Sequence, residues 1–347
     1  MSIRSDTNDL TPGMPEADRR LMGLLQDLPL TAEPWRMVAQ RADIDQPSLL
    51  NKLAQWRTTS RLRHVRAFFN TRRLGCRSTL AAAAVRPDQA DRLAALITAR
   101  PEVSHNFLRE GADLNLWFTL TCPPAGPTPD QVLTELSQAI AQPIRAFDAT
   151  KHYKISFDGL FPASDDWPTP SPPKRTPPIA QLRTALALLQ DDLPLCPQPF
   201  AELAKQNGMT QDDLLQAAIT LKHHGLIRRI GALWNFAKLT ANRNVMTLWN
   251  APADRLDALG RHLAECPRVS HCYQRRTHTD WPWPIYAMLH GAGRDDCLRQ
   301  IDELAAPFTD AEHLELWTVR EYKQSPVRLD ADKIDLKLLD SDSDADV

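Results

Sequence analysis

The second half of this 347-residue chain repeats the first half. Three matched pairs carry the repeat: SRLRHVRAFFN (60–70) with GLIRRIGALWN (225–235), PEVSHNF (101–107) with PRVSHCY (267–273), and HYK (152–154) with EYK (321–323). The offsets of 165, 166 and 169 residues grow slowly in one direction, which is typical of a tandem duplication with small insertions. The chain is therefore expected to contain two copies of one structural unit.

Each copy begins with a helical region. In the second copy, apolar residues recur at helical spacing over 179–189, 200–206 and 214–221, and Thr210-Gln-Asp-Asp213 is a capping-box pattern. Gly225 is expected to end the third helix, and the LIRRIGALW segment after it alternates like a short strand pair. Three helices followed by such a hairpin predict a winged helix-turn-helix unit.

The rest of each copy alternates strands and helices. In the second copy the order is strand 244–249, helix 253–265, strand 269–275, strand 285–290, helix 294–306 and strand 314–322. This βαββαβ order predicts a ferredoxin-like domain, which the first copy repeats over 78–153. The predicted fold class is α+β, a tandem duplication of a winged helix-turn-helix domain and a ferredoxin-like domain. The expected boundaries are 15–75, 76–160, 179–241 and 242–329, with a proline-rich linker at 161–178 and an acidic tail at 330–347.

The linker and tail are predicted from composition. Seven prolines between Phe161 and Ala180 remove backbone donors and favour an extended spacer. The aspartates after residue 330 repel one another, and few apolar residues accompany them, so we expect a solvated tail.

Charge and cysteine content exclude several classes of protein. The 41 Lys and Arg residues balance 43 Asp and Glu residues, so no overall field attracts nucleic acid or anionic lipid. The N-terminal residues are polar, and the most apolar short run, 80–85, is much shorter than a membrane span. Six scattered cysteines without a CxxC pair fit neither a zinc site nor a disulfide framework. We therefore expect a cytoplasmic protein with no membrane partner.

The second strand of each ferredoxin-like domain carries the candidate chemistry. Strand alternation places one set of side chains on one face in each copy: Val103, His105, Phe107 and Arg109, and Val269, His271, Tyr273 and Arg275. A single strand histidine is more often a hydrogen-bonded core residue. An apolar core gains nothing from repeating a cation beside an imidazole, so this face is interpreted as the floor of a pocket for a flat anionic ligand.

The connection after that strand in the second copy, RTHTDWPW at 276–283, combines His278, Trp281 and Trp283. Aromatic planes and cations together suit a conjugated polycarboxylate. The alternative is a loop whose tryptophans close the sheet edge. His290, at the end of the next strand, either faces the same cavity or only ends the strand.

The wings are basic, with Arg61, Arg63, His64, Arg66, Arg72, Arg73, Arg228 and Arg229. Such a wing can contact phosphates. The third helix of the second copy, however, begins with carboxylates that would repel DNA, and the first copy offers only Lys52 and Arg57. Carboxylate binding is the preferred interpretation of the wing, solvated surface is the alternative, and DNA is disfavoured as a partner.

Longer strings give a specific resemblance. GLIRRIGALWN, VSHCYQRR, WPWPIYAMLHG and REYK in the second copy resemble the siroheme decarboxylases built on the Lrp/AsnC fold. In the first copy, FFNTRRLGCRSTLAAAAV, EVSHNFLRE and LNLWFTL are similar to the partner subunit of the same enzymes. The resemblance covers nearly the whole chain except the linker and tail. It implies a fused decarboxylase that converts siroheme to 12,18-didecarboxysiroheme, on the route to haem d1 or to haem.

The resemblance also implies that His105 and His271, beside Arg109 and Arg275, line the substrate cleft. We expect the two histidines to act as acid and as ligand of the siroheme iron, with the division between them open. No cofactor is expected, because the iron arrives with the substrate. The further predicted substrate-binding residues are Arg63, Phe107, Arg228, Arg229, Tyr273, His278, Trp281, Trp283, His290 and Lys323.

Two departures from the family pattern leave alternatives open. Phe236 stands where relatives tend to have a histidine, and WPWPIY stands where they tend to read WPYNLY. Either His271, His278 or His290 replaces that imidazole, or one of two clefts is degenerate. The competing hypotheses are an Lrp/AsnC-type DNA-binding regulator and a non-catalytic subunit that needs a second decarboxylase. A homodimer also stays open.

Overall fold

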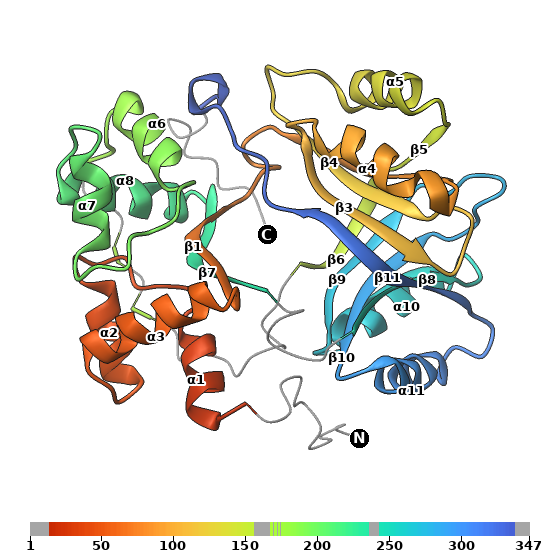
Figure 1. Ribbon diagram of the computed structural model, residues 1–347, viewed down its shortest axis with the longest axis horizontal. Helices are drawn as coiled ribbons and strands as arrows, with labels where there is room; N and C mark the ends of the chain where they lie inside the picture. Colours follow the sequence, from red (N-terminus) through yellow and green to blue (C-terminus); the bar gives the residue numbers. More distant parts are fainter. Residues whose placement is uncertain are drawn as a thin grey trace.

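A computed structural model describes residues 14–155, 167–168, 170–171, 173, 175–235 and 243–336. These residues form a helix-rich half and a sheet-rich half, which lie side by side (Figure 1). Each half contains segments from both sequence repeats, because each copy supplies helices to the helix-rich half and strands to the sheet-rich half. The predicted α+β duplication is thus confirmed, with like domains of the two copies packed together.

The helix-rich half contains both helix-turn-helix units. Their helices are α1 (Glu16–Leu24), α2 (Pro34–Arg41), α3 (Gln46–Thr58), α6 (Ile179–Leu188), α7 (Pro199–Lys205) and α8 (Gln211–His223). The predicted capping box is present, since Thr210 accepts a hydrogen bond from the Asp213 N–H and α8 begins there. Gly225 follows the end of α8 with φ of +67°, as expected of a helix terminator. One apolar cluster joins both units, and α8 buries seven of its residues in the core.

The wings differ from the prediction. We expected a hairpin in each copy, but each copy supplies one strand, β1 (Leu62–Phe69) or β7 (Ile227–Trp234). These two strands pair antiparallel as a separate two-stranded sheet, with Arg66 opposite Gly231. The pairing satisfies the backbone groups that a hairpin partner would otherwise satisfy. Alternating residues predicted the strands correctly, but alternation does not identify the partner strand.

The sheet-rich half is one nine-stranded sheet of order β5-β2-β4-β3-β11-β8-β10-β9-β6. Its strands are β2 (Arg77–Ala83), β3 (Val103–Glu110), β4 (Leu116–Cys122), β5 (Ile144–Phe147), β6 (Ala149–Ile155), β8 (Arg243–Asn250), β9 (Val269–Arg275), β10 (Ile285–Gly291) and β11 (Glu312–Gln324). Four helices accompany them: α4 (Ala90–Thr98), α5 (Pro129–Ile140), α10 (Leu256–Glu265) and α11 (Arg294–Ala305). Two short 3-10 helices lie at Pro87–Gln89 and Ala331–Lys333. The predicted ferredoxin-like order is present in both copies.

The two ferredoxin-like domains exchange the ends of their last strands. After β5 completes the first domain, β6 continues to the other domain and pairs with β9. The long strand β11 pairs with β8 over its first half and with β3 of the first domain over its second half. The repeated HYK and EYK segments are these exchanged ends. The second strand of each domain carries the candidate histidine. Each of these strands is therefore paired along one edge with a strand from the other copy.

The inner sheet face, opposite the helices, is closed by contacts between the domains. One buried cluster combines Trp117 and Phe147 of the first copy with Leu248, Tyr286 and Leu316 of the second. Arg145 at the β5 edge forms a bidentate ion pair with Asp280 of the β9–β10 connection. These contacts require the sheet to curl until its two ends meet.

The tail differs from the prediction over the part that is described. Leu329, Ile334 and Leu336 are buried in the helix-rich half, so residues 330–336 pack instead of lying in solvent. The Gln190 side chain anchors this segment by bonding both the N–H and the C=O of Leu329. The apolar residues between the aspartates were sufficient for docking because a preformed core was available. Residues 337–347 and half of the predicted linker lie outside the described residues.

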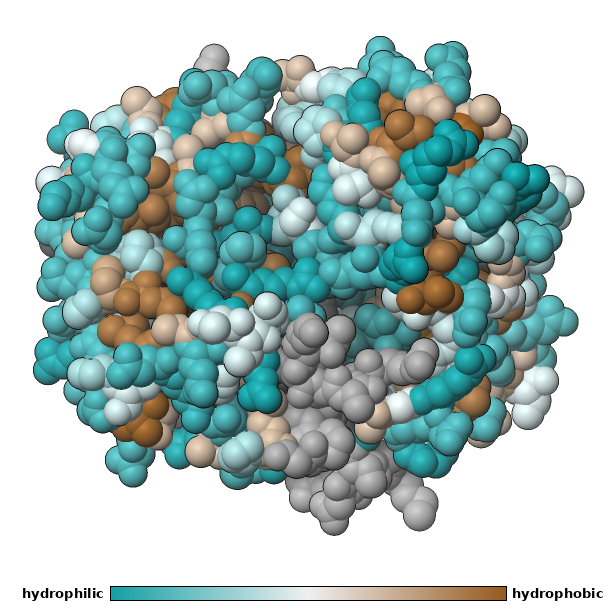
Figure 2. Space-filling model, in the orientation of Figure 1, coloured by the Kyte–Doolittle hydropathy of each residue, from teal (hydrophilic) through white to brown (hydrophobic). Residues whose placement is uncertain are grey.

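Within the described residues, no helix is long and apolar enough to cross a membrane. The side of the molecule seen in Figure 2 is mainly hydrophilic, with small separate hydrophobic patches. All six cysteines are described, and none forms a disulfide.

Candidate functional site

The structure places the predicted histidine, aromatic and arginine side chains together in each copy. On β3, the His105 and Phe107 rings stack with centroids 6.2 Å apart, and the Arg109 guanidinium lies 5.2 Å from the Phe107 centroid. On β9, the His271 and Tyr273 rings are 6.1 Å apart, and Arg275 lies 4.8 Å from the Tyr273 ring. We call these two groups the first and the second histidine cluster. Strand periodicity therefore predicted the shared face correctly.

A serine before each histidine holds the imidazole. Both strands have a register irregularity at this serine, and such bulges re-aim side chains next to functional sites. The Ser104 and Ser270 hydroxyls lie 2.9 Å from Nδ1 of His105 and His271, respectively. Nε2 is thus the ring nitrogen that the serine does not engage. Ser270 also lies 2.7 Å from Nε2 of buried His290, so the second cluster contains a linked pair of imidazoles.

The arginines of the two strands reach across to the opposite domain. Arg109 donates to the Leu316 carbonyl and the Thr318 hydroxyl, at 3.2 and 3.0 Å. Arg275 donates to the Phe147 carbonyl at 2.7 Å. These contacts are equivalent under the duplication. They hold the points where the last strands cross between domains, a role that sequence reasoning did not anticipate.

Of the three wing arginines predicted to bind substrate, Arg63 and Arg228 lie toward the histidine clusters and Arg229 lies away from them. Arg63 of β1 reaches β11 and forms an ion pair with Glu321 at 2.8 Å. Arg228 of β7 is the equivalent residue, and its charge acts on His271 and Tyr273. Arg229 faces away from both clusters, stacks on Phe68 and bonds the Gln26 carbonyl.

The exchanged strands add two residues that sequence reasoning missed. His152 of β6 lies opposite Tyr273, with the ring centroids 5.1 Å apart. Glu321 of β11 occupies the equivalent position opposite Phe107. The only sequence signal was their alignment in HYK and EYK. Lys323, which was predicted to bind substrate, instead bonds the carbonyls at the end of α4, on the helix-covered face.

The predicted aromatic loop belongs largely to the core. Trp281 is buried beside Trp117 and donates to the Tyr286 hydroxyl at 2.9 Å, and Trp283 packs against the same cluster. His278 lies 2.9 Å from the Ala146 carbonyl, at the β5 edge. These placements favour the alternative in which the loop closes the sheet edge. Phe236 lies outside the described residues.

The histidines of the clusters are neutral at pH 7. Burial lowers the pKa of His105 to about 4, and the charges of Arg63 and Arg109 add to the effect. Burial, followed by the charges of His290, His105, Arg275 and Arg228, lowers the pKa of His271 to about 3. The His105 and His271 rings, one from each copy, therefore lie near enough to interact electrostatically. Burial also lowers the pKa of His290 to about 4.

Neutral burial of His290 predicts a pH-dependent stability. Its pKa is about 4 in the folded chain, against an ordinary value of 6.5, so only the unfolded chain gains this proton as the pH falls below about 6.5. Between pH 7.5 and 5, the wild type should lose about 2 kcal/mol of unfolding free energy through this group. His290→Gln should lack that loss. Urea unfolding of both proteins at pH 7.5, 6 and 5 measures it, and equal pH dependence would contradict the neutral assignment.

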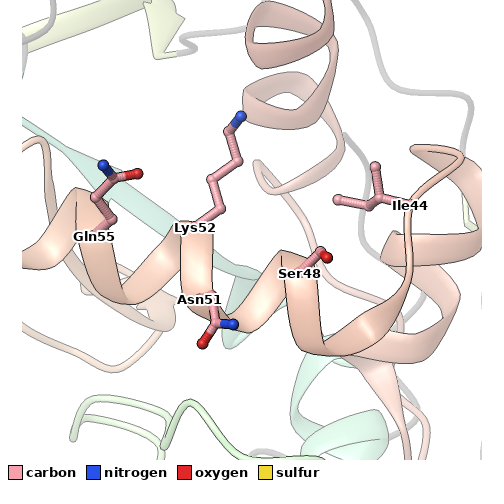
Figure 3. Close-up of a pocket in the computed structure, with 5 residues that line it drawn as sticks. All are labelled: Ile44, Ser48, Asn51, Lys52 and Gln55. Atoms are coloured by element: carbon pink, nitrogen blue, oxygen red, sulfur yellow. The ribbon is translucent and has the colours of Figure 1, made fainter.

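A separate pocket of about 530 Å³ lies at the exposed side of α3 (Figure 3). It is lined by Ile44, Ser48, Asn51, Lys52 and Gln55. Lys52 points toward α1, where it pairs with Asp18 at 2.5 Å. The remaining side chains are neutral and carry no acid or base, so this pocket has no chemistry comparable with that of the histidine clusters.

Comparison with known proteins gives the same organisation. The family described as AsnC-like ligand binding domain matches residues 73–154 and 238–323. A second family, described as siroheme decarboxylase NirDL-like HTH domain, matches residues 183–228.

Similarity to individual proteins extends over nearly the whole chain. A siroheme decarboxylase of Hydrogenobacter thermophilus is 29% identical over 90% of this chain and 94% of its own. A siroheme decarboxylase alpha subunit of Desulfovibrio desulfuricans is 36% identical over 45% of this chain and 90% of its own. A crystal structure of the siroheme decarboxylase NirDL with an iron-uroporphyrin III analogue aligns with a TM-score of 0.68 at 26% identity, over 92% of this chain and 96% of that one.

Proposed function

This chain belongs to the siroheme decarboxylase family, and we propose that it removes CO₂ from two acetate side chains of siroheme to give didecarboxysiroheme for haem d1 formation. The observation that carries the proposal is the duplicated cluster of imidazole, aromatic ring and guanidinium on β3 and β9. Aromatic planes suit a macrocycle, and cations suit its carboxylates. The reaction makes the protein a carboxy-lyase.

The chemistry requires a proton and an acceptor for electrons. An acetate arm R–CH₂–CO₂⁻ loses CO₂ and gains one proton to become R–CH₃, so two steps release two CO₂ and consume two protons. The electron pair of the broken C–C bond enters the pyrrole-type ring, which accepts it once a ring carbon is protonated. No oxidant or reductant is consumed.

His105 and His271 are proposed to share proton delivery and coordination of the substrate iron. A neutral imidazole is the form that coordinates iron, and both rings are neutral at pH 7. Bound substrate carboxylates would place negative charge beside these rings and raise their pKa, which favours proton delivery in the complex. The iron belongs to the substrate, and no separate cofactor is proposed.

DNA binding has less support than catalysis. The two cations that α3 offers are already paired, Lys52 with Asp18 and Arg57 with Asp192 at 2.8 Å. The corresponding helix of the second copy, α8, begins with carboxylates and is largely buried.

We propose a cytoplasmic enzyme whose fused halves correspond to two subunits. Neither a homodimer nor a further subunit is required by the two clusters described above.

The proposal is tested by anaerobic incubation of the purified chain with siroheme, followed by mass spectrometry of the tetrapyrrole. We expect a product that has lost two CO₂ units. Binding, seen as a shifted siroheme absorption band, without a change of mass would favour a non-catalytic subunit. No binding would overturn the proposal and direct attention to duplex DNA.

A further inference from the structure

The two histidine clusters differ in the residues that the exchanged strands β11 and β6 place beside them. Position for position, the first cluster has Glu321 where the second has His152. Phe107 of the first cluster corresponds to Tyr273 of the second, which adds a hydroxyl group. The duplication therefore produced two similar sites with different charges.

In the first cluster, the wing arginine already has a carboxylate partner. The Arg63 guanidinium bonds Glu321 at 2.8 Å and the Gln324 carbonyl at 3.2 Å. Both side chains are largely covered, with exposed fractions of 20% for Arg63 and 35% for Glu321. A partly covered ion pair is screened less by salt than an exposed one. A substrate carboxylate would have to displace Glu321 and would meet its negative charge.

In the second cluster, the equivalent wing arginine has no such partner. Arg228 lies 3.5 Å from the Asn70 amide oxygen, and within the described residues no carboxylate lies within 4 Å of its guanidinium. His152 takes the place of the glutamate and packs against Tyr273. The charges of Arg72, Arg275 and Arg228 act on His152. The negative charge of Asp148 acts on Arg275.

Building on the proposed function, we propose that the acetate arm losing CO₂ binds at the second cluster, where Arg228 and His152 contact its carboxylate, and that Glu321 prevents the same binding at the first cluster. An arginine provides paired donors for a carboxylate, and an imidazole adds a further donor. His152 comes from the first copy and Arg228 from the second, so the substrate carboxylate is held by both halves of the chain.

The test exchanges the two residues in the full chain. His152→Glu places a carboxylate beside Arg228 and should lower kcat/KM for siroheme by about 100-fold, because juxtaposed like charges oppose carboxylate binding. Glu321→His is the matched reverse change; it removes the carboxylate that occupies Arg63 and should keep kcat/KM at or above the wild-type value. His152→Gln keeps a donor but removes the titrating imidazole, and should lower kcat/KM by about tenfold, mainly through KM.

Each outcome discriminates. Equal losses of kcat/KM in His152→Glu and Glu321→His, or a larger loss in Glu321→His, would overturn the proposal that only the second cluster binds the reacting acetate arm. Either result would leave the proposed function intact. Thermal unfolding identifies a variant that has lost its fold. In that case the kcat/KM values of His152→Gln and Glu321→Gln are compared instead, and the larger loss is expected for His152→Gln. If wild type binds siroheme without turnover, the affinities of the exchanged variants replace kcat/KM. Failure of wild type to bind siroheme would overturn both proposals.

Discussion

His271→Ala is expected to lower kcat for siroheme decarboxylation by at least about 100-fold, because proton transfer by a positioned histidine typically contributes about 10²- to 10⁴-fold. His271 is the imidazole that Ser270 holds and that His290 supports through the same hydroxyl. Alanine removes the proton carrier, the iron ligand or both. Single-turnover experiments with mass spectrometry of the tetrapyrrole separate this chemical loss from slower product release.

Two further variants show whether the loss is specific. His105→Ala removes the equivalent ring of the first cluster and should also slow turnover, because the two histidines are proposed to share their roles. His223→Ala, at the exposed end of α8, should leave kcat unchanged. If His105→Ala and His271→Ala both retained wild-type turnover, the assignment of the histidines would be wrong.

Gly231→Ala is expected to reduce the free energy of unfolding by about 3 kcal/mol, the range of substitutions that force atoms into a packed core. An added Cβ at Gly231 would lie 2.1 Å from the Gln26 carbonyl oxygen and 2.7 Å from that of Leu25. These are backbone atoms at the end of α1, and they cannot move aside as a flexible side chain would. Gly231 also lies at the centre of the paired wings, opposite Arg66, so β1 and β7 would have to shift. Urea unfolding at pH 7.5 measures the change.

Gly293→Ala provides the matched control. An added Cβ at Gly293 has no neighbour within 4 Å, and its φ of −174° is extended backbone that any residue adopts. We expect a loss of at most about 1 kcal/mol, because Gly293 is the N-cap of α11 and alanine is a weaker N-cap residue than glycine. Equal effects of the two alanines would mean that the wings are not packed against α1 as described.

Most of the fold could be predicted because the duplication let each copy support the other. The strand at 269–275 was predicted with the bounds it has in the structure, and the helix at 294–306 differs by one residue. The clusters on β3 and β9 could also be predicted, since strand alternation decides which side chains share a face. The α8 capping box was predictable from local hydrogen bonding alone.

Pairing between distant strands could not be predicted. The pattern of HYK shows a strand but not that β6 leaves its own domain for β9, because any edge strand offers the same backbone groups. The roles of Glu321 and His152 depend on that exchange, so neither residue was recognised as part of a cluster. Arg109 and Arg275 were correctly placed beside the aromatic rings, but their contacts to carbonyl groups follow from the exchange of the last strands.

The exchange of last strands also affects how such a gene can evolve. A substitution in the last strand of one repeat changes the site built on the other repeat, because β6 covers β9 and the end of β11 covers β3. Each site therefore depends on the sequence of both repeats. Glu321 in one repeat and His152 in the other each lie beside the site of the neighbouring repeat, so selection on either site acts on both repeats.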